Sequence, residues 1–177
     1  DSADGYSGAA IKRTAEGGYI VAASSSSGFS GTLTGVNNNG MSDYWIIKLN
    51  AFGTLQWQKL LGGSADDYCY AVIQTTDGGY VFTGSSTSNN SGTLTGYNSN
   101  GSLDAFLMKL NNSGDVQWQK LGGGSSLDIA FSIAQVNTGF VVAGHTNSAG
   151  TGYLSGISGN GASEGWLFKL DIFCNTY

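Results

Sequence analysis

The sequence has no proline, a single histidine and two cysteines, and only 11% of its 177 residues are charged. Because His145 is the only histidine, no Ser/His or Cys/His catalytic pair can form without it, and the usual ligand sets of zinc are missing. Cys69 and Cys174 are too few for a disulfide scaffold. The sequence therefore predicts neither an enzyme nor a metal protein, and we expect no cofactor.

Long hydrophobic runs and positive charge are also scarce. No apolar run approaches the roughly 20 residues of a membrane-spanning helix, so no membrane span is expected. The net charge is -5 and the seven basic residues are scattered, which argues against a nucleic-acid partner. Disorder is not expected either, because the apolar residues form regular clusters that can bury surface. The opening residues, Asp1-Ser2-Ala3, suggest a mature, processed or fragmentary product.

Small polar residues, glycine and aromatic residues dominate instead. The chain has 29 glycines and 12% aromatic residues, which favours an all-β fold rich in turns. One segment recurs at offsets of 61 and 60 residues, as Gly18–Ala22, Gly79–Thr83 and Gly139–Ala143. Such a period is typical of stacked or radially arranged units. We therefore expect one repeat domain over residues 1–177, with units 1–63, 64–123 and an incomplete third, 124–177.

Each unit is predicted to contain four antiparallel strands. In the second unit we expect them over Tyr68–Thr76, Tyr80–Gly84, Ala105–Leu110 and Asp115–Leu121. Asp77-Gly78-Gly79 is a strong signal for a hairpin turn between the first two strands. Four strands that follow one another in this way form one blade-like sheet.

The third and fourth strands of a unit differ in pattern. In the third, Phe106 and Met108 share one face and Ala105 and Leu107 the other, so both faces are apolar, as in a sheet packed on two sides. In the fourth, glutamines alternate with apolar residues, which predicts an edge strand with one wet face. Five aromatic residues are expected to be structural. We expect Trp57 and Trp118 to pack between neighbouring sheets, and Trp45, Phe106 and Trp166 to lie in the core.

The repeated pattern can be written as GG-[YF]-[IV]-V-A-[AG]-S, a Ser/Asn/Gly loop, D-x-W-x-x-K-L, G-x-x-x-W-Q-K and GG-S-x-x-D. It resembles the tandem repeats of predicted β-propellers in secreted and cell-surface bacterial proteins. The resemblance implies three four-stranded antiparallel repeats that form blades of a partial β-propeller. Closed propellers usually have about four to eight blades, so a β-prism, in which three sheets surround one core as in some lectins, is the alternative.

The same resemblance implies a non-catalytic module, secreted or on the cell surface, that acts in structure or adhesion through a protein partner or self-association. A glycan-binding, lectin-like module is the alternative. A third reading is a fragment of a quinone-cofactor dehydrogenase propeller, since Leu49–Trp57 and Leu110–Trp118 look like the tryptophan-docking repeats of that family. This chain has no adjacent cysteine pair and no acidic cluster to match the rest of that family's site.

Three long loops offer a candidate contact face: Ser24–Ser42, Ser85–Leu103 and His145–Ser163. A meander places them on one side, with the links 62–67 and 122–128, and loops of this length are often functional. The alternative is that they are ordered spacers, each anchored by a buried leucine such as Leu33. The candidate binding residues for a protein or a glycan are Asn37, Asn38, Asn39, Tyr97, Asn98, Asn100, Tyr153 and Asn160.

The acidic residues favour structure over chemistry. Asp43, Asp104 and Glu164 recur once per unit before a strand, and the pair Asp66-Asp67 is expected to cap a turn. No long loop has more than one acid before its final residue, which disfavours calcium binding, and only backbone carbonyl and Asn oxygens are left that could build such a site.

Overall fold

The structure is a computed structural model that describes residues 9–28, 33, 36–100, 102–148, 163–172 and 175. These residues form three antiparallel sheets of four, four and three strands, so the predicted all-β class is confirmed. Sheet 1 contains β1 (Ala10–Arg13), β2 (Tyr19–Ser25), β3 (Asp43–Leu49) and β4 (Leu55–Leu61). Sheet 2 contains β5 (Asp67–Gln74), β6 (Tyr80–Ser86), β7 (Asp104–Leu110) and β8 (Val116–Gly122). Sheet 3 contains β9 (Asp128–Val136), β10 (Gly139–Thr146) and β11 (Glu164–Asp171).

Each sheet is a meander, in which strands that follow one another in the chain are hydrogen-bonded neighbours. The strands of the second unit lie within two residues of the predicted ranges, and β4 and β8 are edge strands as the glutamine pattern predicts. A short hairpin with the sequence Asp77-Gly78-Gly79 connects β5 to β6. Gly78 has a φ of 81° there, which residues with a side chain rarely adopt. The local turn signals therefore place the strands.

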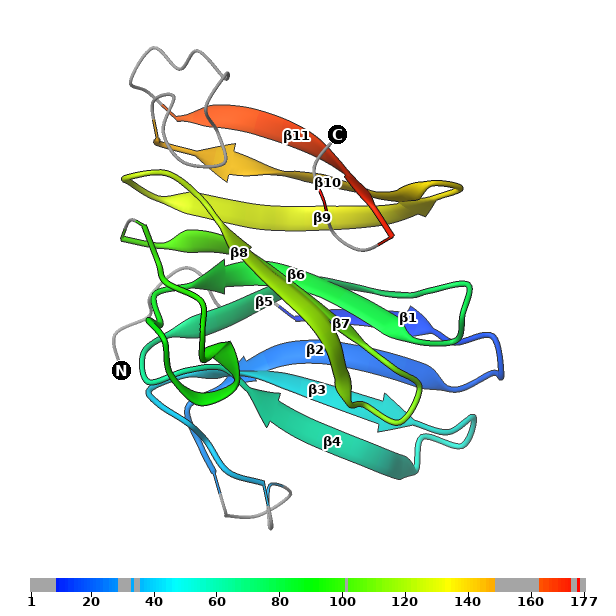
Figure 1. Ribbon diagram of the computed structural model, residues 1–177. Coiled ribbons are helices and arrows are strands. Elements are labelled where there is room, and N and C mark those ends of the chain that lie inside the picture. Colours follow the sequence, from blue (N-terminus) through cyan, green and yellow to red (C-terminus); the bar gives the residue numbers. More distant parts are fainter. Residues whose placement is uncertain are drawn as a thin grey trace.

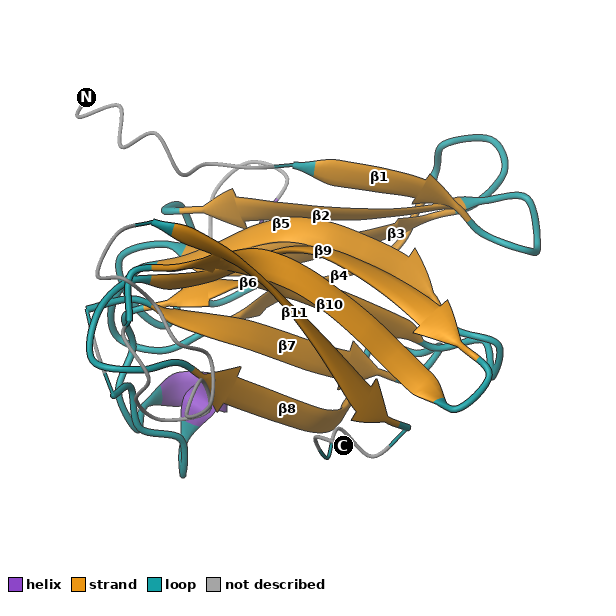
Figure 2. Cartoon of the chain, turned by 90° about the horizontal axis from the view of Figure 1, so that it is seen from above, coloured by secondary structure: helices purple, strands orange, loops and turns teal. Residues whose placement is uncertain are grey.

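Sheet 2 lies between sheet 1 and sheet 3, and the three sheets do not close into a ring (Figure 1). The short hairpins lie at one end of this stack, on the right in Figure 1, and the long connections with the short helix η2 (Gly92–Leu94) lie at the other. Figure 2 shows the same arrangement from above, with the strands of the three sheets layered over one another. The stack therefore has a hairpin end and a long-loop end.

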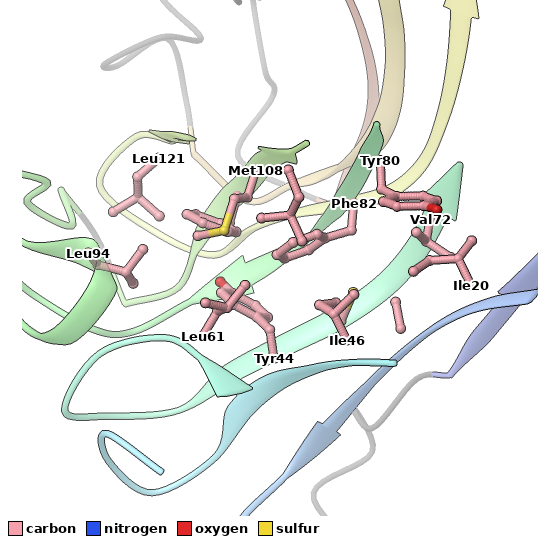
Figure 3. Packing of buried hydrophobic residues seen from close by; sticks show 14 residues of the cluster. Ile20, Tyr44, Ile46, Leu61, Val72, Tyr80, Phe82, Leu94, Met108 and Leu121 are labelled. Atoms are coloured by element: carbon pink, nitrogen blue, oxygen red, sulfur yellow. The ribbon is translucent and has the colours of Figure 1, made fainter. Parts of the chain in front are cut away.

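Two separate hydrophobic clusters hold the stack together. The first lies between sheets 1 and 2, and Figure 3 shows side chains from both sheets pointing into it. There the rings of Tyr44 and Phe106 stack with centroids 4.7 Å apart. The second cluster lies between sheets 2 and 3 and contains Ala105, Leu107 and Trp166. Every residue of β6 and β7 is consequently buried, as the two apolar faces of the third strand predict.

The two faces of each sheet can be told apart by the order of the sheets along the chain. We call the face toward the preceding sheet the leading face and the face toward the following sheet the trailing face. In sheet 2 the leading face carries Phe82, Phe106 and Met108, and the trailing face carries Val81 and Leu107. Repeat equivalence and cross-strand pairing assign the same faces in sheets 1 and 3. Each internal junction thus joins a trailing face to the next leading face.

Candidate functional site

The leading face of sheet 1 has no sheet against it among the described residues. Its members from β1, β2 and β3 are Ile11, Tyr19, Val21, Ala23, Trp45, Ile47 and Leu49. Ile11 is 60% exposed, whereas its repeat equivalents Val72 and Ile133 are 0% and 7% exposed. The difference arises because another sheet covers each equivalent residue, while Ile11 belongs to the first sheet of the stack. An apolar sheet face is therefore open at this end.

Among the described residues, the trailing face of sheet 3 is open in the same way. Leu167 in β11 is 66% exposed, while its equivalents Ile46 and Leu107 are 0% and 7% exposed. Val141 and Ala143 lie beside it on β10 and are partly exposed. Together the two ends of the stack present apolar surface whose counterparts in the middle are core, which is typical of an interaction surface.

The hairpin end carries two clefts that the repeat builds in the same way. The first, of about 500 Å³, lies between sheets 1 and 2 and is lined by Trp57, Tyr80, Gln56 and Gln74 among others. Trp57 packs edge-on against Tyr80 at 5.8 Å, and its indole N–H donates to the carbonyl oxygen of Asn112 at 3.2 Å. This residue therefore connects sheet 1 to sheet 2 as well as lining a cleft.

The second cleft, of about 330 Å³, lies between sheets 2 and 3. Trp118 lines it and packs against Phe140 at 5.9 Å, which repeats the contact made by Trp57. Tyr19 holds the position of Tyr80 and Phe140 in sheet 1, where the described chain supplies no such tryptophan. One tryptophan per junction thus joins a trailing face to the next sheet.

A buried lysine and an acid complete each cleft. Lys48 Nζ lies 2.7 Å from a Glu16 carboxylate oxygen, and Lys109 Nζ lies 2.7 Å from an Asp77 carboxylate oxygen. The hydrogen bond from Lys48 lowers the pKa of Glu16 to about 2. Lys48 Nζ also donates to Gln56 and to the carbonyl of Leu49, both at 3.0 Å. The polar groups of the first cleft therefore bond to one another.

At the long-loop end, several candidate binding residues shape the loops that carry them. The backbone and side-chain amides of Asn39 donate to the Asp43 carboxylate at 2.6 and 3.2 Å, and the backbone N–H of Asn100 donates to Asp104 at 2.6 Å. Asn38 bonds within its own loop to Gly40, and Tyr97 packs on the first cluster. Asn37 and Asn98 are exposed, while Tyr153 and Asn160 lie outside the described residues.

Leucine anchors hold these loops as the sequence predicts. Leu33 and Leu94 are 4% and 0% exposed. The backbone N–H of Thr93 donates to the carbonyl of Gly62 at 2.8 Å, so the loop of the second unit is tied to the link between sheets 1 and 2. The equivalent residue of the third unit, Leu154, lies outside the described residues.

Buried aspartates organise the same link. Asp67 accepts hydrogen bonds from the Gly63 N–H and from the hydroxyls of Ser86 and Ser88, as the predicted turn cap implies. A side chain at Gly62 would collide with the carboxylates of Asp43 and Asp67, so these two acids converge on a glycine. Burial, which outweighs these hydrogen bonds, raises the pKa of Asp67 to about 6. Asp104, Asp128 and Gly123 repeat this arrangement between sheets 2 and 3.

The groups with the most reactive chemistry are dispersed. His145 lies in β10 and bonds to Ser163. Cys69 is fully buried in β5, where burial raises the pKa of its thiol, and Cys174, with any disulfide to it, lies outside the described residues. Within the described ranges no three His, Cys, Asp or Glu residues gather as metal ligands would. The described part of the chain also contains no helix with the length and hydrophobicity for crossing a bilayer.

Comparison with known proteins adds no assignment: no model of a known protein family matches the chain, and no curated protein matches it. The residues that identify the candidate site must therefore come from the repeat itself. Ile11 and Leu167 were not among the predicted binding residues. Ile11 aligns with Val72 in the repeat, and Leu167 aligns with Leu107. Val72 and Leu107 are core residues of sheet 2, so the same positions in the first and last sheets of the stack could have been predicted as apolar but uncovered.

Proposed function

We propose that this chain is a non-catalytic structural or adhesion module, secreted or on the cell surface, that acts through protein–protein assembly. The observation that carries the proposal is the pair of open apolar faces at the ends of the stack. Ile11 and Leu167 occupy positions that are buried elsewhere in the repeat, yet they are 60% and 66% exposed. Burying such a residue contributes about 1.5–3 kcal/mol, so a partner that covers these faces gains stability from contacts the repeat already uses.

The packing supports an arc of a propeller over a prism. In a prism, three sheets would each turn one face toward a single shared core. Here sheet 2 is buried on both faces and contributes to two separate clusters, with Phe106 in the first and Leu107 in the second. Successive sheets packed face to face are the arrangement of propeller blades.

The assembly function can be tested on the full chain and on a double variant, Ile11→Glu with Leu167→Glu. Analytical ultracentrifugation measures the mass between about 1 and 100 μM, and a dye that fluoresces on apolar protein surface reports open faces. We expect the wild type either to associate or to bind the dye as a single chain, and the double variant to do neither. A wild-type chain that stays single and binds no dye would overturn the proposal.

A glycan-binding module is the second candidate, and the cleft beside Trp57 favours it. An indole ring next to the amides of Gln56 and Gln74 and the carboxylate of Glu16 offers apolar and hydrogen-bonding surface in a cleft of about 500 Å³. A glycan array probed with the wild type and with Trp57→Ala tests this reading, with Trp118→Ala as the matched control at the second cleft. Glycan binding lost only in Trp57→Ala would favour it, and no binding by the wild type would remove it.

A further inference from the structure

We propose that the leading face of sheet 1 in one copy of this chain packs on the trailing face of sheet 3 in a second copy, as neighbouring sheets pack within the chain. The inference rests on the proposed assembly function and names its partner. Both internal junctions join a trailing face to a leading face, and the two faces left open are one of each kind. A contact between two copies would therefore continue an interface that the chain already makes twice.

Side-chain size at one junction position supports this pairing. On the trailing face the residue at this position is Tyr44 in sheet 1 and Ala105 in sheet 2. Tyr44 stacks on Phe106 of the next leading face, with centroids 4.7 Å apart. Ala105 lies in the same cluster as the equivalent leading-face residue, Trp166. A smaller trailing residue thus accompanies a larger leading residue.

The open faces extend this compensation. The trailing residue of sheet 3 is Gly165, which has no side chain, and the leading residue of sheet 1 is Trp45. Trp45 is partly exposed, and its indole N–H donates to Gln58 at 3.0 Å, which orients the ring. Close packing requires that volumes at an interface match, so a glycine at this trailing position leaves space for a tryptophan on the opposite face. Two copies of the chain would supply both halves of that fit.

The number of sheets also fits a second copy. A head-to-tail contact closes into a ring when the same contact can be made twice. Two copies, each with the three sheets that the described residues form, bring together six of these sheets, within the range of about four to eight in closed propellers. We therefore expect a particle of two chains, with twice the 18.2 kDa mass of one.

Complementation between two charged variants tests the direction of the contact. Ile11→Glu blocks only the leading face of sheet 1, and Leu167→Glu blocks only the trailing face of sheet 3. Both residues are largely exposed in one chain, so each variant should fold. We expect each variant alone to sediment as one chain, and an equimolar mixture to form a pair, because each variant retains the face that the other has lost.

A second pair of variants tests the proposed fit between Gly165 and Trp45. Among the described residues, a Cβ at Gly165 meets only the Gly144 carbonyl oxygen, at 3.9 Å, so Gly165→Trp has room against this part of its own chain. We expect Gly165→Trp to weaken association by more than about tenfold through overpacking against Trp45, and Gly165→Ala to retain it as Ala105 does internally. Mixing Gly165→Trp with Trp45→Ala should restore the pair, because the large residue has changed sides.

Three results would overturn the self-docking proposal: a wild type that stays single at 100 μM, a charged mixture that stays single, or Gly165→Trp that associates as well as the wild type. If the wild type is single but its faces bind dye, self-docking fails while the assembly function stands. If it is single and binds no dye, both fail.

Discussion

Sheet 2 and the two outer sheets come from the same repeat but meet different surroundings. All residues of β6 and β7 are buried, whereas β2, β3 and β10 in sheets 1 and 3 also have partly exposed positions and β11 has exposed ones. Leu107 and Leu167 are the same residue at the same repeat position, with 7% and 66% exposure. Burial in a repeat protein is thus a property of position in the array as well as of sequence.

The largest expected effect sharpens this comparison directly. Leu107→Ala removes a buried side chain between sheets 2 and 3 and should lower the free energy of unfolding by about 2–5 kcal/mol. Leu167→Ala makes the same chemical change on an exposed face and should cost less than about 0.5 kcal/mol. Urea denaturation at a concentration where the chain is single measures both. Equal losses would mean that the trailing face of sheet 3 is covered within one chain.

The same pair of variants connects stability to assembly. If a second copy covers Leu167, its substitution should also lower the apparent stability at high protein concentration, because a bound partner stabilises the folded state by mass action. The gap between Leu107→Ala and Leu167→Ala should then narrow as the concentration rises. If the two variants keep the same difference in free energy of unfolding over the protein concentrations at which the sedimenting mass doubles, the contact between copies does not involve Leu167.

Much of the fold follows from the sequence because the repeat states it three times. Apolar side chains on both faces at Ala105, Phe106 and Leu107 predict a strand buried on both sides, and the alternating glutamines predict the edge strands. The sequence does not predict the open faces, because Ile11 and Leu167 are ordinary apolar residues of the repeat. They differ from their equivalents only in that no neighbouring sheet of the described chain covers them. The sequence does not predict the clefts either, because Lys48 and Glu16 are far apart in a linear pattern and meet only when β3 pairs with β2 beside the first hairpin. The length and composition of the loops predict a binding role for residues such as Asn39. The structure shows that the amides of Asn39 donate to Asp43, and the binding role stays a prediction.

An intermediate effect concerns the buried acid at the first junction. The pKa of Asp67 is raised from 3.8 to about 6, so the folded chain binds a proton more tightly than the unfolded chain. Its contribution to stability is therefore fully present below pH 4 and is lost as the pH rises through 6. The change amounts to at most about 3 kcal/mol, since one pKa unit corresponds to about 1.4 kcal/mol.

Asp67→Asn should remove this pH dependence while keeping an acceptor for the Gly63 N–H. Urea denaturation from pH 4 to 7 measures it, and Asp66→Asn, beside it in the link, is the control. An unchanged slope in Asp67→Asn would show that another group titrates in this range.

The smallest expected effect is that of the lysine–acid ion pairs, which are present at the hairpin end of the first two units and have no acid at the equivalent hairpin position in the third. Lys48 and Lys109 are buried beside Glu16 and Asp77, whereas Lys169 is exposed and the hairpin before β10 has Asn137 at the acid's position. Lys48 lowers the pKa of Glu16 from 4.5 to about 2, so its contribution is present above pH 4.5 and is lost as the pH falls through 2. Because the Glu16 side chain is 51% exposed, solvent screens the pair, and Glu16→Gln should cost less than about 1 kcal/mol at pH 7.

Urea denaturation at pH 7 and pH 3 measures this contribution, and 1 M salt should shrink it. Lys169→Gln is the matched control, since its charge is exposed and the change should fall within about 0.5 kcal/mol at either pH. If Glu16→Gln lowered the free energy of unfolding as much as Leu107→Ala does, the comparison would be contradicted. The ion pairs at the hairpin end would then stabilise the fold as strongly as the buried clusters between the sheets.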